Sequence, residues 1–209
     1  MSRTSSRPAE STPFRSLEDI RKQRRGPGLT AEDWADAALW SLADGVDALS
    51  VEKLARRLGV TKGGFYWHFK DRADLLRAAL ERWEQLATAG VIAQLEALAD
   101  PGERLRQLLA LTFESGPHGR IEVAIVAGAS ADPRIQPVLA RVSQQRIDYL
   151  VKLYRALGLP AREARHWGVQ AYSTYVGLLH LAISSPETLS TERARAEYVK
   201  HVARTLIPA

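Results

Sequence analysis

The sequence has no cysteine among its 209 residues, which excludes disulfide bonds and thiolate chemistry and fits a reducing cytoplasm. Long apolar runs are also missing, since the longest, 123–129 and 175–183, fall far short of the roughly 20 residues that a membrane helix needs. The opening residues MSRTSSRPAE lack the apolar core of a signal peptide. We therefore expect a soluble, cytoplasmic protein with no membrane partner.

Motifs for catalysis and metal binding are absent as well. There is no H-E-x-x-H sequence, no Gly-rich phosphate loop and no G-x-S-x-G sequence. Ser184 and Ser185 lie near His180, but nothing in the sequence organises a nucleophile there. We expect no enzyme, no metal and no cofactor. The alternative, a helical enzyme or carrier, would require a catalytic signal that is lost on mutation of His118 or His180.

The net charge of +5 is unevenly distributed. Residues 1–29 carry seven basic and three acidic side chains, and residues 51–82 carry eight and four. From residue 83 onward the numbers are fourteen and twelve, close to neutral. Positive charge confined to one end favours a nucleic-acid partner, although a solvated surface would explain any single cluster.

Residues 50–76 are typical of a helix-turn-helix. Apolar residues at helical spacing predict an amphipathic helix over 51–58. Ser50 is a suitable N-cap for this helix, and Gly59 suits the left-handed residue that ends it. Thr61 can then cap a short second helix over about 62–68. The succession of helix, tight glycine turn and short helix is the helix-turn-helix signature.

The second helix has an unusual composition for a structural helix. Gly63 and Gly64 each cost about 1 kcal/mol of helix propensity relative to alanine, which makes sense if the backbone must approach a partner closely. Phe65 and Phe69 are four residues apart and can fill a small core, which leaves residues 66–68 facing outward. An ordinary helical hairpin with a basic solvated face is the alternative interpretation.

The stretch from about Thr30 to Leu80 resembles the DNA-binding domain of the TetR family of bacterial transcriptional regulators. The matching motifs are Gly45, LARRLGV at 54–60, YWHF at 66–69 and RADLL at 72–76. Arg72 stands where the family usually has lysine, so the positive charge is retained. The resemblance covers about a quarter of the chain, and the remainder matches only in length and helical character.

The resemblance implies a DNA-binding surface around the second helix, with Lys70 and Arg72 on phosphates and Tyr66 and His68 on phosphates or base edges. Trp67 either contacts DNA or packs beneath the helix. The basic run 21–25 is either an arm on the DNA or a solvated tail. The residues expected to contact DNA are Ser50, Lys53, Thr61, Lys62, Gly63, Gly64, Tyr66, Trp67, His68, Lys70 and Arg72, with Arg24 and Arg25 from the arm.

The chain as a whole is predicted to be all-α, because proline or glycine marks the breaks and no segment shows sustained period-2 alternation. Residues 1–28 are expected to be a disordered basic arm, 29–76 the three-helix DNA-binding domain, and 77–209 a helical domain for effector binding and dimerisation. A long helix should begin after Asp71 and run through Leu86 or beyond. Further helices are expected at 102–115, 119–130, 134–157, 162–184 and 191–206.

The second domain contains aromatic residues and histidines among small and aliphatic ones, as ligand pockets do. By resemblance, some of them line a cavity for a small, apolar or aromatic effector, although any one of them could instead fill the core or a subunit interface. The candidate ligand-binding residues are Trp83, Phe113, His118, Trp167, Tyr172, Tyr175 and His180.

The expected function is that of a ligand-responsive repressor that binds a palindromic operator as a homodimer. Two reading heads about 34–36 Å apart require a symmetric dimer. By resemblance, the last two long helices form the interface. They carry one apolar stripe at Trp167, Ala171, Thr174, Leu178 and Ala182 and another at Tyr198, Val202 and Leu206, and the sequence leaves open which stripe faces the partner and which the pocket. A regulator without a small-molecule effector, controlled by a protein partner or acting as an activator, is the alternative.

Overall fold

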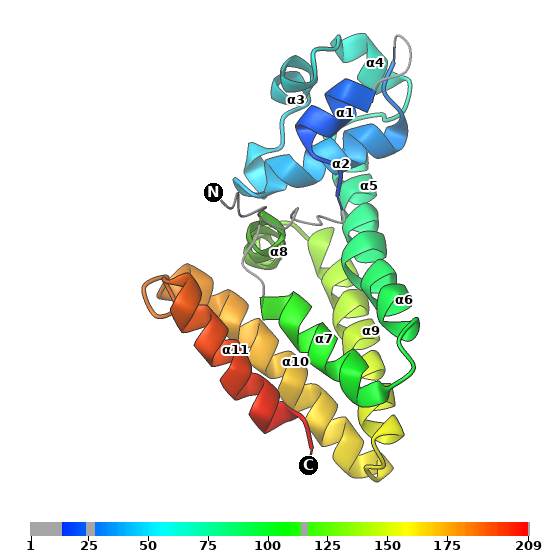
Figure 1. Cartoon of the computed structure of the whole chain (residues 1–209). Helices are drawn as coiled ribbons and strands as arrows, with labels where there is room; N and C mark the ends of the chain where they lie inside the picture. The colour runs from blue at the N-terminus through cyan, green and yellow to red at the C-terminus, as the bar shows by residue number, and fades with distance from the viewer. Residues whose placement is uncertain (1–13, 24–27, 114–116, 209) are drawn as a thin grey trace, which may run out of the picture.

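The structure is a computed structural model, and it describes residues 14–23, 28–113 and 117–208 (Figure 1). Within these ranges it consists of helices joined by short turns and contains no strand, which confirms the predicted all-α class. The elements are α1 (Leu17–Gln23), α2 (Ala31–Leu42), η1 (Val46–Ala48), α3 (Val51–Leu58), α4 (Lys62–Tyr66), α5 (Arg72–Glu84), η2 (Gln85–Gly90), α6 (Val91–Glu96), α7 (Pro101–Phe113), α8 (Pro117–Gly128), α9 (Ile135–Ala156), α10 (Ala161–Ser184) and α11 (Glu192–Leu206).

The helix-turn-helix forms for the local reasons that the sequence indicates. The Ser50 hydroxyl accepts the Lys53 backbone N–H and caps α3. Gly59 adopts φ 68°, a left-handed conformation that costs a glycine nothing. Thr61 has the extended backbone of an N-cap, but its side chain makes no capping bond to α4. The Gly59 turn therefore has the predicted conformation. The Thr61 side chain, however, does not cap the first backbone N–H groups of α4.

The helix α1 is a departure from the prediction that residues 1–28 are disordered. Ser16 caps this helix through the Asp19 backbone N–H, at 3.0 Å, and α1 packs on α2 and α3. Phe14 and Ile20 are buried in the domain core. The composition of residues 1–28 did not indicate this helix, because Phe14 and Ile20 stabilise it only when they pack against α2 and α3. Residues 1–13 and 24–27 lie outside the described chain.

The helix predicted to begin after Asp71 and to run through Leu86 or beyond is present as α5, η2 and α6 in succession. Asp71 caps α5 by accepting the Asp74 backbone N–H at 2.9 Å. A π-helical segment, η2, joins α5 to α6, and such segments are commonly found at functional positions. Figure 1 shows this continuous rod leading from the N-terminal domain down along α9. The rod is therefore the covalent and structural link between the two halves of the molecule.

The helices α7 to α11 form the larger body. The longest contact is between α9 and α10, where Gly168 allows close approach, because a Cβ there would lie 2.8 Å from Val151 Cγ2. At the top of the body α8 touches α2 and η1, and a Cβ on Gly128 would lie only 2.5 Å from Val46 Cγ2. The N-terminal domain is thus packed on the body at α8 as well as joined to it by α5. In the described ranges, no helix is long and apolar enough to cross a membrane.

Candidate nucleic-acid interface and effector region

The short helix α4 is held in place from below by two phenylalanines. Phe65 is completely buried and meets Trp34 of α2 edge to face, with ring centroids 5.6 Å apart. Phe69 is also buried and stacks on Phe65 at 5.6 Å. Such aromatic pairs contribute about 0.5–1.5 kcal/mol beyond simple burial. These contacts fix the orientation of a helix that contains two glycines.

The opposite side of α4 is exposed. Tyr66 is 64% exposed and Trp67 is 87% exposed, so Trp67 does not pack beneath the helix in this structure. Lys62 and Gly63 are exposed at the start of the same helix, and Gly64 is half-buried. Tyr66 and Trp67 are adjacent in the sequence, and tyrosine and tryptophan are enriched at interfaces because each combines an apolar ring with a polar group. The surface that α4 presents therefore combines aromatic groups, a lysine and open backbone.

The remaining predicted DNA contacts surround this helix at the surface. Lys53 and Thr61 are exposed, and Lys70 is exposed directly after Phe69. Ser50 is half-buried and occupied as the α3 cap. Arg24 and Arg25 lie outside the described residues.

Two predicted contact residues have internal partners. The Arg72 Nε donates to the Leu49 carbonyl at 2.8 Å and Nη2 donates to the Val46 carbonyl at 2.5 Å. His68 places Nε2 at 2.7 Å from the Leu29 carbonyl oxygen. The Arg72 guanidinium therefore has a structural role on the η1 turn, and its contact with a phosphate stays a prediction. The sequence could not reveal this, since the partners lie 23 and 26 positions away.

An acidic residue missed by the sequence analysis lies at the same surface. Glu52, in the first turn of α3, accepts a hydrogen bond from the Lys62 ammonium at the start of α4. Both side chains are largely solvent-exposed, at 66% and 49%. The hydrogen bond and the charge of Lys62 lower the pKa of Glu52 from its ordinary value. The pair bridges the two helices of the helix-turn-helix.

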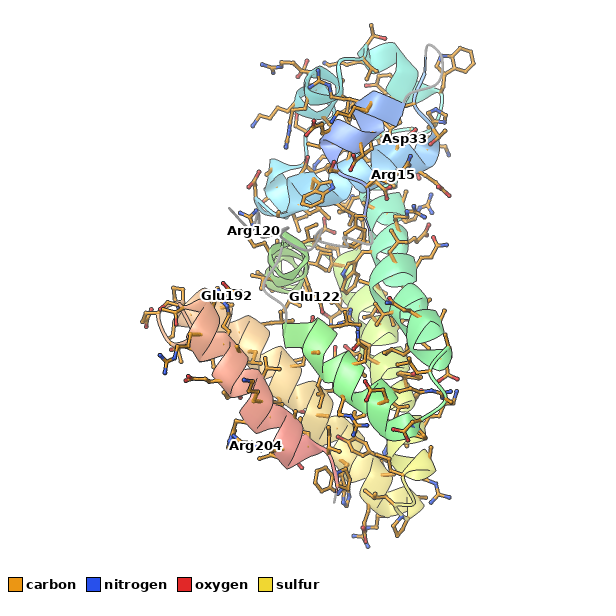
Figure 2. The ribbon with its side chains drawn as sticks, viewed as in Figure 1. Arg15, Asp33, Arg120, Glu122, Glu192 and Arg204 are labelled. Carbon is orange, nitrogen blue, oxygen red and sulfur yellow. The ribbon has the colours of Figure 1, made fainter. Side chains whose placement is uncertain are left out.

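A second missed feature is a buried carboxylate between the N-terminal segment and α5. Asp36 of α2 is fully buried and accepts hydrogen bonds from Arg15 Nε at 3.1 Å and Arg82 Nε at 2.8 Å. Arg15 also pairs with Asp33 at 2.7 Å, and Figure 2 labels both of these residues beside α1 and α2. The bond to Asp36 is the largest influence on Arg82 and raises its pKa. One aspartate thus joins α2 to the segment preceding α1 and to α5.

The body contains a buried ion pair inside an aromatic cluster. Arg146 of α9 donates to Glu122 of α8 at 2.5 and 3.2 Å, and Figure 2 labels Glu122 on that helix. The guanidinium carbon lies 5.5 Å from the Trp83 ring and 5.6 Å from the Tyr175 ring, as in cation–π contacts. Burial by itself would lower the pKa of Arg146, but the charge of Glu122, its hydrogen bond to the guanidinium and the neighbouring Tyr175 and Tyr172 together outweigh burial and raise the pKa. Arg146 therefore remains charged in the middle of the body.

Arg146 also contacts η2. Its Nε donates to the Thr88 hydroxyl at 3.1 Å, and its Nη2 lies 3.3 Å from the Ala87 carbonyl oxygen. The Arg146 side chain thus links α8, α9, α10 and the π-helical segment of the rod. Any change of position around Glu122 or Tyr175 would be transmitted to the rod through these bonds.

The structure separates the predicted ligand-binding residues into groups. Trp83 and Tyr175 flank Arg146, and the Tyr172 hydroxyl lies beside them, 2.8 Å from the Ser143 hydroxyl. Trp83 is 1% exposed and belongs to the core shared with the N-terminal domain. Trp167 lies elsewhere, against Tyr154 in a second core, and His180 is exposed on α10. The side chains of Phe113 and His118 lie outside the described part.

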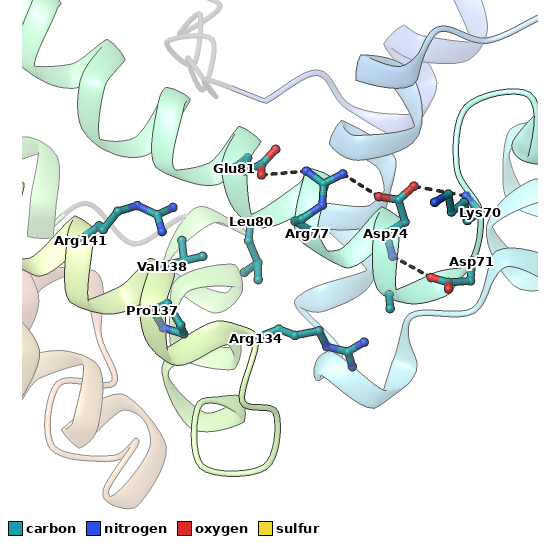
Figure 3. A pocket seen from close by; sticks show the side chains of 11 residues that line it. Lys70, Asp71, Asp74, Arg77, Leu80, Glu81, Arg134, Pro137, Val138 and Arg141 are labelled. Atoms are coloured by element: carbon teal, nitrogen blue, oxygen red, sulfur yellow. Dashed lines mark hydrogen bonds and ion pairs between the residues drawn. The ribbon is translucent and has the colours of Figure 1, made fainter.

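A surface crevice of about 500 Å³ lies where the first half of α5 crosses the start of α9 (Figure 3). Leu80, Pro137 and Val138 form its apolar wall. Charged residues surround this wall, and Arg77 is paired at 2.6 Å with Asp74 and at 2.9 Å with Glu81. Because the crevice is bounded by both the rod and the body, its width depends on the angle between them.

The exposed side of α10 carries other apolar residues than the stripe that helical periodicity indicated. Ala171 of that stripe is buried inside the protomer, and Val202 and Leu206 of α11 are buried in the second core. The exposed apolar residues of α10 instead recur at seven-residue spacing, at Val169, Val176 and Ile183. Helical periodicity located both faces, but only packing against α9 showed which face is internal.

These features define a helix-turn-helix protein in which the helix-turn-helix domain is joined to a larger helical body. Residues 36–79 match the family model described as bacterial regulatory proteins, tetR family. The regulator AcrR of Shigella flexneri is 35% identical over 100 residues, which is 46% of this chain and 45% of AcrR. The matched part therefore spans about half the length of that relative.

Solved structures share the fold over most of the chain. A TetR transcriptional regulator from Legionella pneumophila has a TM-score of 0.71 at 19% identity and covers 88% of this chain and 100% of its own. A transcriptional regulator from Rhodococcus has a TM-score of 0.68 at 21% identity, covering 85% and 94%. At such identities the likeness establishes the fold alone. The family model therefore matches the helix-turn-helix domain, and the solved structures extend the likeness in fold to TetR-family regulators over most of the chain.

Proposed function

We propose that this protein is a repressor that binds a specific DNA sequence through α3 and α4. The observation that carries the proposal is the exposed surface of α4, with Tyr66, Trp67 and Lys62 held outward by the buried Phe65 and Phe69. An α-helix fits the major groove, and side chains there read base edges while flanking lysines contact phosphates. Such a protein would act in the bacterial cytoplasm, where its DNA lies.

The test is selection of the purified full chain against a random duplex library at near-physiological salt. Enrichment of an inverted repeat is the expected result, because a two-fold dimer reads two equivalent half-sites. Binding that depends steeply on salt but enriches no motif would contradict sequence-specific recognition. Tyr66→Ala should abolish most of the preference while leaving the melting temperature unchanged, because its side chain is largely exposed.

The dimer is proposed to form through the exposed apolar face of α10. Val169, Val176 and Ile183 supply a stripe that a second copy would cover. Val176→Arg should convert the dimer to a monomer in light scattering and weaken operator binding. The matched control is Gln170→Arg, which adds the same charge at an exposed position of the same helix. A dimer that survives Val176→Arg would locate the interface elsewhere.

The effector is proposed to be a small, apolar or aromatic molecule that binds beside Trp83, Tyr172 and Tyr175. Two of these rings already hold the Arg146 guanidinium, which also bonds to the π-helical segment of the rod. A ligand that binds one arrangement of this cluster more tightly would shift the angle of α5 and the spacing of the reading heads.

Thermal shift separates this mechanism from a regulator without a small-molecule effector. A ligand that binds the native state raises the melting temperature, and above its Kd the stabilisation grows with the logarithm of the ligand concentration. A library of apolar aromatic compounds should therefore yield ligands that both raise the melting temperature and release the selected DNA. Release should be lost in Tyr175→Ala. Compounds that stabilise the protein without releasing DNA would contradict the proposed coupling.

A further inference from the structure

The first turn of α4 leaves sequence readout to very few side chains. It consists of Lys62, Gly63 and Gly64, followed by the buried Phe65. No added Cβ would meet a neighbour at Gly64, so this part of the helix is open backbone. Lys62 is therefore the only long polar side chain available to base edges at the helix start. A residue that binds the Lys62 ammonium will therefore influence how this helix recognises base edges.

The Lys62 ammonium is bound by Glu52 within the protein. We infer that Glu52 is a specificity-determining residue, which keeps Lys62 from binding DNA phosphates indiscriminately. The inference rests on the proposed function. Its physical basis is competition, because an ammonium already paired with a carboxylate gains less from a phosphate than a free one does.

The position of Glu52 strengthens this competition. It lies in the first turn of α3, where a negative charge is favoured by the helix dipole, and it is 66% exposed at the edge of the reading surface. A carboxylate at that edge also repels any phosphate that approaches Lys62. Non-specific DNA presents phosphates only, whereas a correct site adds acceptors on base edges, such as guanine O6 and N7. Glu52 therefore penalises non-specific binding more than specific binding.

The pair is suited to this role because it is weak. Exposed ion pairs contribute little to stability, so the correct DNA can displace Glu52 without a large loss. A buried pair at this position would instead block Lys62 altogether. Because the pair contributes little to folding stability, Glu52 can be substituted without unfolding the protein.

The test measures binding of the full chain to its selected site and to a random duplex of equal length, across a series of salt concentrations. For Glu52→Gln we expect affinity for the random duplex to rise about three- to tenfold and affinity for the selected site to rise less. The slope of log affinity against log salt on the random duplex should steepen by about 0.9, the value for one additional phosphate contact. Lys62→Met should remove this effect in the double variant.

A matched control distinguishes pairing with Lys62 from a general change of net charge. Glu81→Gln removes the same charge from an exposed ion pair with Arg77 on α5, away from α4. It should leave the slope and the ratio of the two affinities close to those of the wild type. Equal effects of Glu81→Gln and Glu52→Gln, or an unchanged slope in Glu52→Gln, would overturn the inference.

The inference and the proposed function fail separately. A wild-type protein that prefers no sequence would contradict the repressor proposal. Even then, the slope of log affinity against log salt on the random duplex shows whether Glu52 competes with phosphates for Lys62. If the wild-type protein selects a clear site but Glu52→Gln does not change the salt slope, the repressor proposal is supported. In that case Glu52 does not determine specificity.

Discussion

Replacing Asp36 with asparagine removes one charge from a fully buried position at which two arginines converge. In the native structure the carboxylate lies 2.8 Å from Arg82 Nε and 3.1 Å from Arg15 Nε. Asparagine keeps the shape and one acceptor oxygen, so the packing of α2 changes little. The guanidinium of Arg82, only 16% exposed, would then retain Glu32 at 3.7 Å as its acidic partner.

The expected loss of stability follows from that geometry. Breaking a buried ion pair by removing one partner costs about 3–5 kcal/mol, because the other charge remains desolvated. Arg15 is 35% exposed and also has Asp33 as a partner, so it can recover part of its solvation. We therefore expect a smaller loss of stability than this range, about 2–3 kcal/mol. Because Asp36 joins α2 to α5, the orientation of the reading domain on the rod should also loosen.

Urea unfolding at fixed protein concentration measures the effect. With a slope of about 1–3 kcal/mol per molar, such a loss moves the midpoint by roughly 1–3 M. Glu32→Gln is the control, since Glu32 is mostly exposed and meets Arg82 only at 3.7 Å, and it should change the midpoint very little. An Asp36→Asn midpoint within experimental error of the wild type would refute the argument that this carboxylate holds the junction together.

Two further predictions concern the junction and the reading surface. Gly128→Ala should destabilise the protein by about 1–3 kcal/mol through overpacking, since the new Cβ would lie 2.5 Å from Val46 Cγ2. In the same helix Gly119→Ala meets no neighbour within 4 Å and should instead raise the melting temperature, and the reverse order would contradict the packing argument. Arg72→Ala should lower stability by about 1–3 kcal/mol, because buried carbonyls lose their donor. Lys70→Ala should leave the melting temperature unchanged and weaken DNA binding. If Arg72→Ala instead weakened DNA binding at an unchanged melting temperature, Arg72 would be a phosphate anchor and not a structural residue.

The sequence by itself determined most of the helical elements and their approximate ends, with α1 as the exception. Periodic apolar residues, the caps at Ser50 and Asp71 and the glycine turn at Gly59 act over a few neighbouring positions, so their effects can be worked out without a fold. The helices predicted at 134–157 and 162–184 agree with α9 and α10 to within a residue or two. The inward role of Phe65 and Phe69 followed from the same local periodicity.

Only the tertiary structure decided which partners the side chains have. The pairing of Lys62 with Glu52, the docking of Arg72 on the η1 turn and the burial of Asp36 between two arginines join residues 10 to 46 positions apart. The same holds for α1, whose two buried residues gain stability only from the surface of α2 and α3. Local patterns specify where a helix begins and which face is apolar. Which charge meets which, and which apolar face is left exposed, depends on how the helices pack, because contact energies arise only when distant segments meet.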